Sequence, residues 1–187
     1  GAAREVSGSC HLLTVGDHTI ALDCGLFQGH LAQSREKNAR FPIPPDRLSA
    51  IVLSHAHIDH AGRLPYVARL GFKGTVWTTP ATRDLCDVML MDSAFIQEKD
   101  AEFLRRRGAA VIEPLYTTAD IPPLMQQVKT KPYGESFQVV PGMRATYVDA
   151  GHILGSASVV LECTEGSRTR RLIFSGDIGR WGQPIIR

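Results

Sequence analysis

The sequence contains few cysteines and no long apolar run. Its four cysteines are single and widely spaced, at Cys10, Cys24, Cys86 and Cys163. This spacing disfavours a disulfide framework and a structural zinc site built on cysteine pairs. No stretch approaches the roughly 20 apolar residues that span a bilayer, and nothing at the start resembles a signal peptide. We therefore expect a cytoplasmic protein that has no membrane partner.

The sequence also lacks a large excess of charge of one sign. Its net charge is +2, with 43% hydrophobic and 21% charged residues, as in ordinary globular proteins. This mildly basic balance permits an anionic partner but does not argue for one. Because we find no internal repeat or low-complexity segment, the 187 residues are expected to form one domain with an adequate core.

The sequence does contain a dense cluster of metal-ligand residues in 54–64, straight after the apolar run 50–53. Three imidazoles and one carboxylate fall within six positions, at His55, His57, Asp59 and His60. Nitrogen and oxygen ligands of this kind suit zinc. The alternative is a chance cluster of core or surface histidines. Four ligands directly after a buried-strand pattern argue against that alternative.

The spacing within this cluster also has a geometric meaning. If the backbone is extended through His55 and His57, both rings lie on one face and reach one ion. Asp59 and His60 follow after the chain turns, so they can face a second ion beside the first. Gly62 and Pro65 fit a turn followed by a short helix.

Three more ligand-type residues follow other predicted strands. A hairpin of strands 11–15 and 18–22 ends at Asp23, a strand over 143–148 leads to His152, and a strand over 170–174 leads to Asp177. Taken singly, the two aspartates also fit plain turn residues and the histidine a glycine-rich turn. Since a rigid sheet holds the loops at its strand ends, we expect these side chains to converge on one edge.

The remaining pattern predicts helices and strands in alternation. Thr79 and Pro80 open a helix whose apolar stripe is interrupted at 92–93, which indicates two helices or a kink. A second helix starts at 118–120 and carries Leu124, Met125 and Val128. Short strands are predicted over 74–78, 137–140 and 156–163. The predicted hairpins favour mixed or antiparallel sheets in an α/β protein.

Four stretches of the sequence, taken together, resemble the motifs of a known family. His-x-His-x-Asp-His after an apolar strand resembles the metallo-β-lactamase superfamily. The stretches 22–25, 150–157 and 174–177 resemble its beta-CASP branch of RNA- and DNA-processing nucleases. The resemblance implies an αββα sandwich with mixed sheets flanked by helices. It implies that residues 1–187 form the N-terminal portion of the metallo-β-lactamase domain, cut before an inserted beta-CASP domain. The two ends of the sequence are expected to be cut from a longer chain, because residues 1–4 lack an initiator Met and residues 183–187 stop where the family would continue.

The resemblance also implies a catalytic centre of two zinc ions, with manganese as an alternative. His55, His57 and His152 would bind the first ion, and Asp59 and His60 the second. Asp177 would bridge the two, and Asp23 would orient the histidines from behind. A hydroxide held between the metals would attack the phosphorus.

The family completes its second site with a later histidine, but none of the seven histidines here follows His152. We therefore expect these 187 residues alone to bind metal incompletely and to be a poor nuclease.

The predicted function is a zinc-dependent ribonuclease of RNA processing or decay. RNA is its expected partner, single-stranded DNA a possible one, and a homo-oligomer its possible assembly. One alternative is a hydrolase of small esters, lactones or thioesters, because the same metal core serves acyl and phosphoryl transfer. Another is a non-catalytic RNA-processing subunit, which the six intact ligand positions disfavour.

Overall fold

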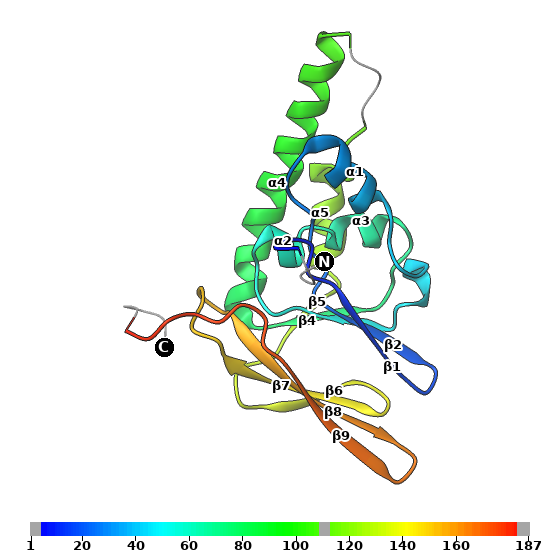
Figure 1. Cartoon of the computed structure of the whole chain (residues 1–187), viewed down its shortest axis with the longest axis vertical. Helices are drawn as coiled ribbons and strands as arrows, with labels where there is room; N and C mark the ends of the chain where they lie inside the picture. The colour runs from blue at the N-terminus through cyan, green and yellow to red at the C-terminus, as the bar shows by residue number, and fades with distance from the viewer. Residues whose placement is uncertain (1–4, 109–112, 183–187) are drawn as a thin grey trace.

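Two β-sheets lie face to face, and helices cover the outside of one of them (Figure 1). The computed structural model describes residues 5–108 and 113–182. The expectations for 1–4 and 183–187 lie outside these residues. The first sheet has five strands in the order β1 (His11–Val15), β2 (His18–Leu22), β3 (Ala50–Val52), β4 (Thr75–Thr78) and β5 (Val128–Thr130). The strands β1 and β2 are antiparallel, and the other neighbours are parallel.

The second sheet has four antiparallel strands in chain order. They are β6 (Ser136–Val140), β7 (Met143–Asp149), β8 (Ala157–Glu165) and β9 (Arg168–Phe174). The prediction of mixed and antiparallel sheets is thus confirmed.

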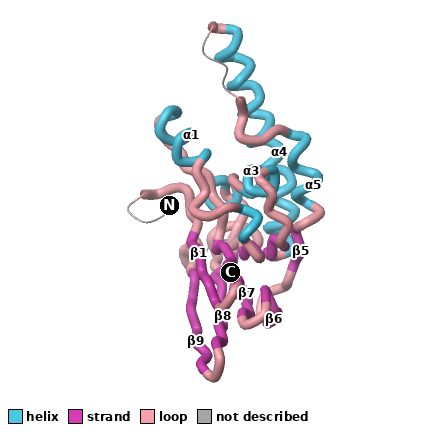
Figure 2. Tube along the Cα trace, turned by 90° about the vertical axis from the view of Figure 1, so that its right-hand side faces the viewer, coloured by secondary structure: helices cyan, strands magenta, loops and turns pink. Residues whose placement is uncertain are grey.

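The helices lie on one side of the strands, as Figure 2 shows. They are α1 (Leu31–Ala39), α2 (Ile58–Ala61), α3 (Leu64–Arg69), α4 (Pro80–Arg106) and α5 (Ile121–Met125), with short 3₁₀ turns at Pro45–Arg47 and Thr118–Asp120. Within the described ranges, the outer face of the second sheet carries no helix. The layers are therefore helix, sheet and sheet, which is part of the predicted αββα sandwich. None of the described helices is long and apolar enough to pass through a membrane.

Alternating side chains of the central strands enter two separate cores. Ala21 and Ile51 face the helices, while Ile20 and Val52 face the second sheet. All four are buried, as expected for strands that are covered on both faces. The core between the sheets is completed by Phe137, Met143, Tyr147 and Leu161 of the second sheet. Packing in these two cores fixes the edge of the sheet at which β2 and β3 end.

Two predictions about elements are wrong. The helix α4 runs without a break through Asp92 and Ser93. The Ser93 hydroxyl lies 2.9 Å from the Tyr116 hydroxyl, so it bonds outside the helix instead of competing with the helix backbone. Val128 belongs to β5 and pairs with Val76, because the preceding helix already ends at Met125. The helix start is as predicted, since the Thr79 side chain accepts a hydrogen bond from the Thr82 amide.

Candidate metal centre

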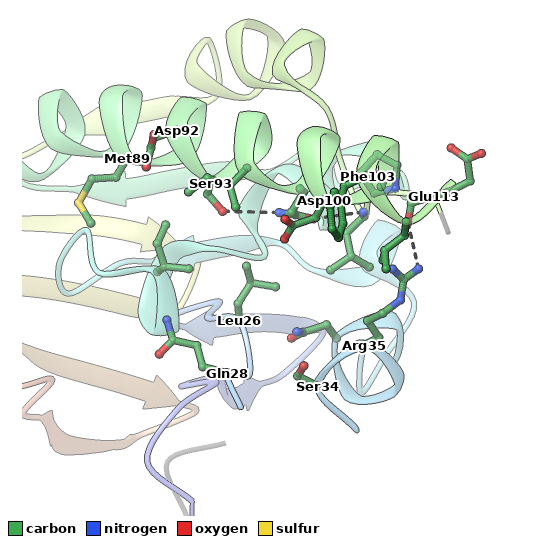
Figure 3. A pocket seen from close by; sticks show the side chains of 18 residues that line it. Leu26, Gln28, Ser34, Arg35, Met89, Asp92, Ser93, Asp100, Phe103 and Glu113 are labelled. Atoms are coloured by element: carbon green, nitrogen blue, oxygen red, sulfur yellow. Dashed lines mark hydrogen bonds between the residues drawn. The ribbon is translucent and has the colours of Figure 1, made fainter. Parts of the chain in front are cut away.

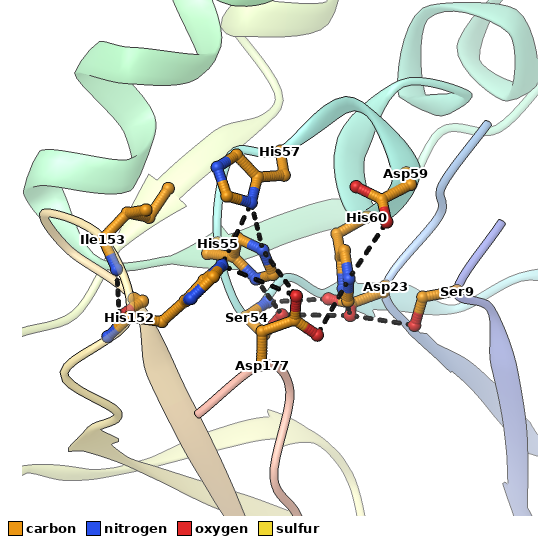
Figure 4. Close-up of polar contacts among 11 residues, drawn as sticks. Ser9, Asp23, Ser54, His55, His57, Asp59, His60, His152, Ile153 and Asp177 are labelled. Carbon is orange, nitrogen blue, oxygen red and sulfur yellow. Dashed lines mark hydrogen bonds and ion pairs between the residues drawn. The ribbon is translucent and has the colours of Figure 1, made fainter. Parts of the chain in front are cut away.

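Four side chains from three strand-end loops meet at one edge of the two sheets (Figure 4). His55 and His57 follow β3, His152 follows β7, and Asp177 follows β9. Each offers one ligand atom, and these four atoms all lie within 4.8 Å of one another. The structure therefore brings together residues that are up to 122 positions apart, 55 to 177, in the sequence.

The nitrogens of this group point toward a common centre. His57 Nδ1 lies 3.1 Å from His55 Nε2 and 3.1 Å from His152 Nε2. Asp177 Oδ2 lies 3.5 Å from His152 Nε2 and 4.0 Å from His55 Nε2. The His57 nitrogen thus faces the other two nitrogens, and those two face a carboxylate oxygen, which is the arrangement of a ligand set.

Burial and the neighbouring imidazole rings keep His55 and His57 uncharged. Burial, with the neighbouring rings of His60, His57 and His152, lowers the pKa of His55 to about 2. Burial first, and then His152, also lowers the pKa of His57. Neutral imidazole is the form that binds metal. The contact of His55 with Asp177 is accordingly not an ion pair.

A second group lies beside the first. His60 Nε2 is 3.3 Å from Asp177 Oδ1 and 3.7 Å from Asp59 Oδ2. The two oxygens of Asp177 thus face different groups of histidines, with Oδ2 toward His55 and His152 and Oδ1 toward His60. This carboxylate occupies the position between two ligand sets.

Asp23 lies beneath the second group and is fully buried. Its Oδ2 is 2.6 Å from His60 Nδ1 and accepts hydrogen bonds from the hydroxyls of Ser9 and Ser54. Its Oδ1 accepts from the Ser54 amide at 2.8 Å. Burial works to lower the pKa of His60, but the hydrogen bond and charge of Asp23, with Asp177 and Asp59, outweigh burial and raise it. Asp23 therefore holds His60 with Nδ1 as the donor and directs Nε2 toward the site.

The backbone around Asp23 is shaped for this contact. Asp23 has a φ of 60°, in the left-handed region that Asp tolerates better than most residues. Two residues later, a Cβ on Gly25 would lie 1.6 Å from the Asp59 carbonyl oxygen. Glycine at 25 is thus required by the close approach of the β2 loop to the α2 turn that carries Asp59 and His60.

Sequence reasoning missed three supporting side chains. Ser9 and Ser54 donate to Asp23, and the buried Arg63 donates from Nε to the Gly25 carbonyl oxygen at 2.7 Å. Ser54 and Arg63 lie inside the 54–64 motif, so their positions were a usable signal. Ser9 has no sequence signal, because its role depends on the pairing of β1 with β2.

The donor set fits divalent metal ions. Three imidazoles and one carboxylate converge, and nitrogen and oxygen donors of this type suit zinc. A cavity of about 570 Å³ lies elsewhere, between α1 and α4 (Figure 3). Its lining includes Leu26 and Ile58 but none of the converging histidines or aspartates. The candidate site is therefore defined by its converging side chains and not by this cavity.

Comparison with known families agrees with this geometry. The family model of the metallo-beta-lactamase superfamily matches residues 3–180, so the chain belongs to this superfamily. Solved structures share the fold. A metallo-beta-lactamase from Cronobacter sakazakii has a TM-score of 0.54 at 20% identity, covering 96% of this chain and 56% of that one. MEM-A1, a subclass B3 metallo-beta-lactamase from a soil metagenome library, has a TM-score of 0.52 at 19% identity, covering 89% and 56%.

Curated relatives are more similar in sequence. Ribonuclease TTHA0252 of Thermus thermophilus is 36% identical over 100% of this chain and 38% of its own length. Transcription termination factor FttA is 31% identical in Cenarchaeum symbiosum, over 100% of this chain and 27% of the relative. The FttA of Thermococcus kodakarensis is 34% identical, over 95% and 27%. These relatives are of the beta-CASP type, which confirms the resemblance. The chain spans less than two-fifths of their length.

Proposed function

We propose that this chain is the metal-binding core of a hydrolase that cleaves RNA phosphodiesters. The observation that carries the proposal is the convergence of His55 Nε2, His57 Nδ1, His152 Nε2 and Asp177 Oδ2 within 4.8 Å. In this proposal those four residues hold one cation. Asp59 and His60 hold a second, and Asp177 is shared. Zinc is the favoured metal because imidazole nitrogen dominates the set.

Two bound zinc ions would supply activated water for attack on phosphorus and would offset the charge that develops on the phosphate oxygens. The chain's own residues do the rest. Asp23 holds the proton of His60 on Nδ1, and the Ser9 and Ser54 hydroxyls hold Asp23. The half-exposed Asp177 keeps one oxygen toward each ligand group and leaves the edge open to a polymer.

The choice of RNA as substrate is supported by the names of the relatives. One is called a ribonuclease and others a transcription termination factor, and both kinds match nearly the whole chain. Metal ligands by themselves do not separate phosphodiesters from esters, lactones or thioesters. The substrate panel below must therefore include both classes.

The test uses the full-length protein with end-labelled RNA, single-stranded DNA and a panel of lactones and thioesters. We expect RNA cleavage that a chelator abolishes and that added zinc restores. His57→Ala should bind less zinc and lose cleavage. Ser93→Ala, which removes a hydroxyl of α4 that bonds to Tyr116 and to none of the ligand residues, should keep both. Lactone hydrolysis without RNA cleavage would support the small-molecule alternative, and an RNA-cleaving protein that is indifferent to chelator would refute the metal assignment.

A further inference from the structure

The candidate site is divided between the two sheets. His55, His57 and His60 belong to loops of the first sheet, whereas His152 and Asp177 belong to loops of the second. A ligand set that straddles two layers needs contacts that fix one layer against the other. Ligand geometry must hold within a few tenths of an ångström, and the core between sheets is built from non-directional apolar contacts.

Directional contacts across this boundary gather at the loop that carries His152. At the end of this loop the Ala157 amide donates to the Ser54 carbonyl oxygen at 2.9 Å, and two side chains donate to one further carbonyl oxygen, that of Gly155. The buried Gly155, three residues after His152, accepts hydrogen bonds from the Thr79 hydroxyl at 2.7 Å and from the Thr82 hydroxyl at 2.8 Å. Both threonines are 1% exposed or less and lie in the cap and first turn of α4, which begins directly after β4 of the first sheet. The two layers are therefore joined by side-chain hydrogen bonds from α4 to the loop that carries His152.

The contact is close as well as directional. Gly155 has a φ of +80°, and a Cβ there would lie 2.5 Å from the Thr82 amide nitrogen. The carbonyl dipole also meets the N-terminal end of a helix, where negative partial charge is favoured. The loop backbone is thus pressed onto the first turn of α4.

Within the loop, hydrogen bonds to Ser156 connect the Gly155 backbone with His152. The Ser156 hydroxyl oxygen accepts hydrogen bonds from the amides of His152 at 3.0 Å and Ile153 at 3.2 Å. The Ser156 carbonyl oxygen accepts a further bond from the Tyr133 hydroxyl at 2.9 Å. Hydrogen bonds therefore tie residues 152–156 together.

We propose that Thr79 and Thr82 are positioning residues that set His152 against His55 and His57. The inference rests on the proposed cation at His152. The two hydroxyls touch no ligand atom, and they reach His152 only through the Gly155 carbonyl. Thr82 is the cleaner of the two to test, because Thr79 also caps the helix by accepting from the Thr82 amide.

The test measures zinc affinity by chelator competition, and site symmetry by the absorption spectrum of bound Co²⁺, on the full-length protein. Thr82→Val keeps the side-chain shape and removes the donor. We expect about tenfold weaker binding, the lower end of the range for losing a group that supports a ligand, together with an altered Co²⁺ spectrum. Thr82→Ser keeps the hydroxyl and should restore both. Ser93→Ala removes a hydroxyl bond from the same helix and should change neither.

Three outcomes decide the matter. Wild-type zinc affinity and spectrum in Thr82→Val would overturn the inference, provided that His57→Ala does lose zinc. If His57→Ala also binds zinc normally, the proposed metal site itself fails. If Thr82→Val does not fold, Tyr133→Phe removes a different side-chain bond to this loop, the one to the Ser156 carbonyl oxygen, from a partly exposed position. A smaller loss of affinity in Tyr133→Phe would support the inference, and no loss would overturn it.

Discussion

Asp23 shows how one carboxylate serves both folding and the site. It is fully buried, it adopts a left-handed backbone conformation, and its two oxygens accept from Ser9, Ser54 and His60. A buried carboxylate is tolerable only when its oxygens are satisfied in this way. The strain of about 1 kcal/mol or more at its backbone is a cost that the surrounding contacts must offset. A substitution that removes the charge of Asp23 should therefore have a large effect on the side chains that it holds.

We expect Asp23→Asn to weaken binding of the second cation by about 10- to 100-fold, because an amide no longer fixes the proton of His60 on Nδ1. The first cation should bind nearly as in the wild type. Calorimetric zinc titration of the full-length protein measures both. Asp17→Asn, an exposed change in the turn between β1 and β2, is the matched control. Equal loss at both sites, or at neither, would contradict the role given to Asp23.

Gly25→Ala should destabilise the fold by about 3 kcal/mol, since the added Cβ meets the backbone oxygen of Asp59 and not a flexible side chain. Gly16→Ala is the comparison. Its Cβ has open space, so only the backbone penalty of about 1 kcal/mol at φ +55° remains. Urea unfolding of both variants tests this, and similar stabilities would show that the β2 loop can move away from α2.

At the scale of the element, α4 divides into two unlike halves. Its buried residues Thr82, Cys86, Leu90 and Ala94 recur every four positions and end there. The later turns carry Phe95, Ile96 and Phe103 with about half of each side chain exposed, at 51%, 51% and 54%. Figure 1 shows this half extending past the other helices, and Figure 3 shows it as one wall of the cavity beside α1. Only the first half is anchored in the core.

Two substitutions in this helix should therefore differ strongly. Leu90→Ala removes a fully buried side chain and should cost about 2–5 kcal/mol of unfolding free energy. Phe103→Ala should cost about 0.5 kcal/mol, as expected for an exposed position. Urea denaturation followed by circular dichroism compares them directly. A loss at Phe103 as large as that at Leu90 would mean that the second half of α4 is packed as tightly as the first.

At the scale of the whole molecule, the ligand groups lie where the two sheets meet. A cation held by His55 and His57 from one sheet and by His152 and Asp177 from the other would connect the layers. It would bind the folded state only, since these residues are up to 122 positions apart in the unfolded chain, from 55 to 177. Metal binding and folding should therefore be coupled.

Zinc at 100 times its dissociation constant should stabilise the protein by about 2.7 kcal/mol. The melting temperature should rise by roughly 2–4 °C for each kcal/mol in a chain of this size. Thermal denaturation with zinc and with chelator measures the shift, and His57→Ala should abolish most of it. A melting temperature that does not respond to zinc would argue against a site that spans both sheets.

Much of the local structure was predictable. The hairpin of β1 and β2, the strand before the 54–64 motif, the cap at Thr79 and the ligand-type residues at strand ends all follow from periodicity, turn residues and motif spacing. The two wrong predictions concern single elements, but both involve tertiary contacts. Val128 pairs with a strand that lies 52 residues earlier, at Val76. The helix α4 continues through its polar residues 92–93, and the Ser93 hydroxyl bonds to Tyr116 outside the helix.

The sequence by itself determined which residues carry side chains of the metal-ligand type and that these residues follow strands, because ligand chemistry and hydrophobic period are local properties. The tertiary structure alone decided that Ser9 supports Asp23, that Asp177 faces two groups at once, and that α4 bonds to the loop of His152. These contacts join segments up to 122 positions apart, between 55 and 177. The contacts of Asp177 and of α4 form only when the two separately patterned sheets pack face to face, whereas the contact of Ser9 needs the pairing of β1 with β2. No single stretch of the chain specifies either arrangement.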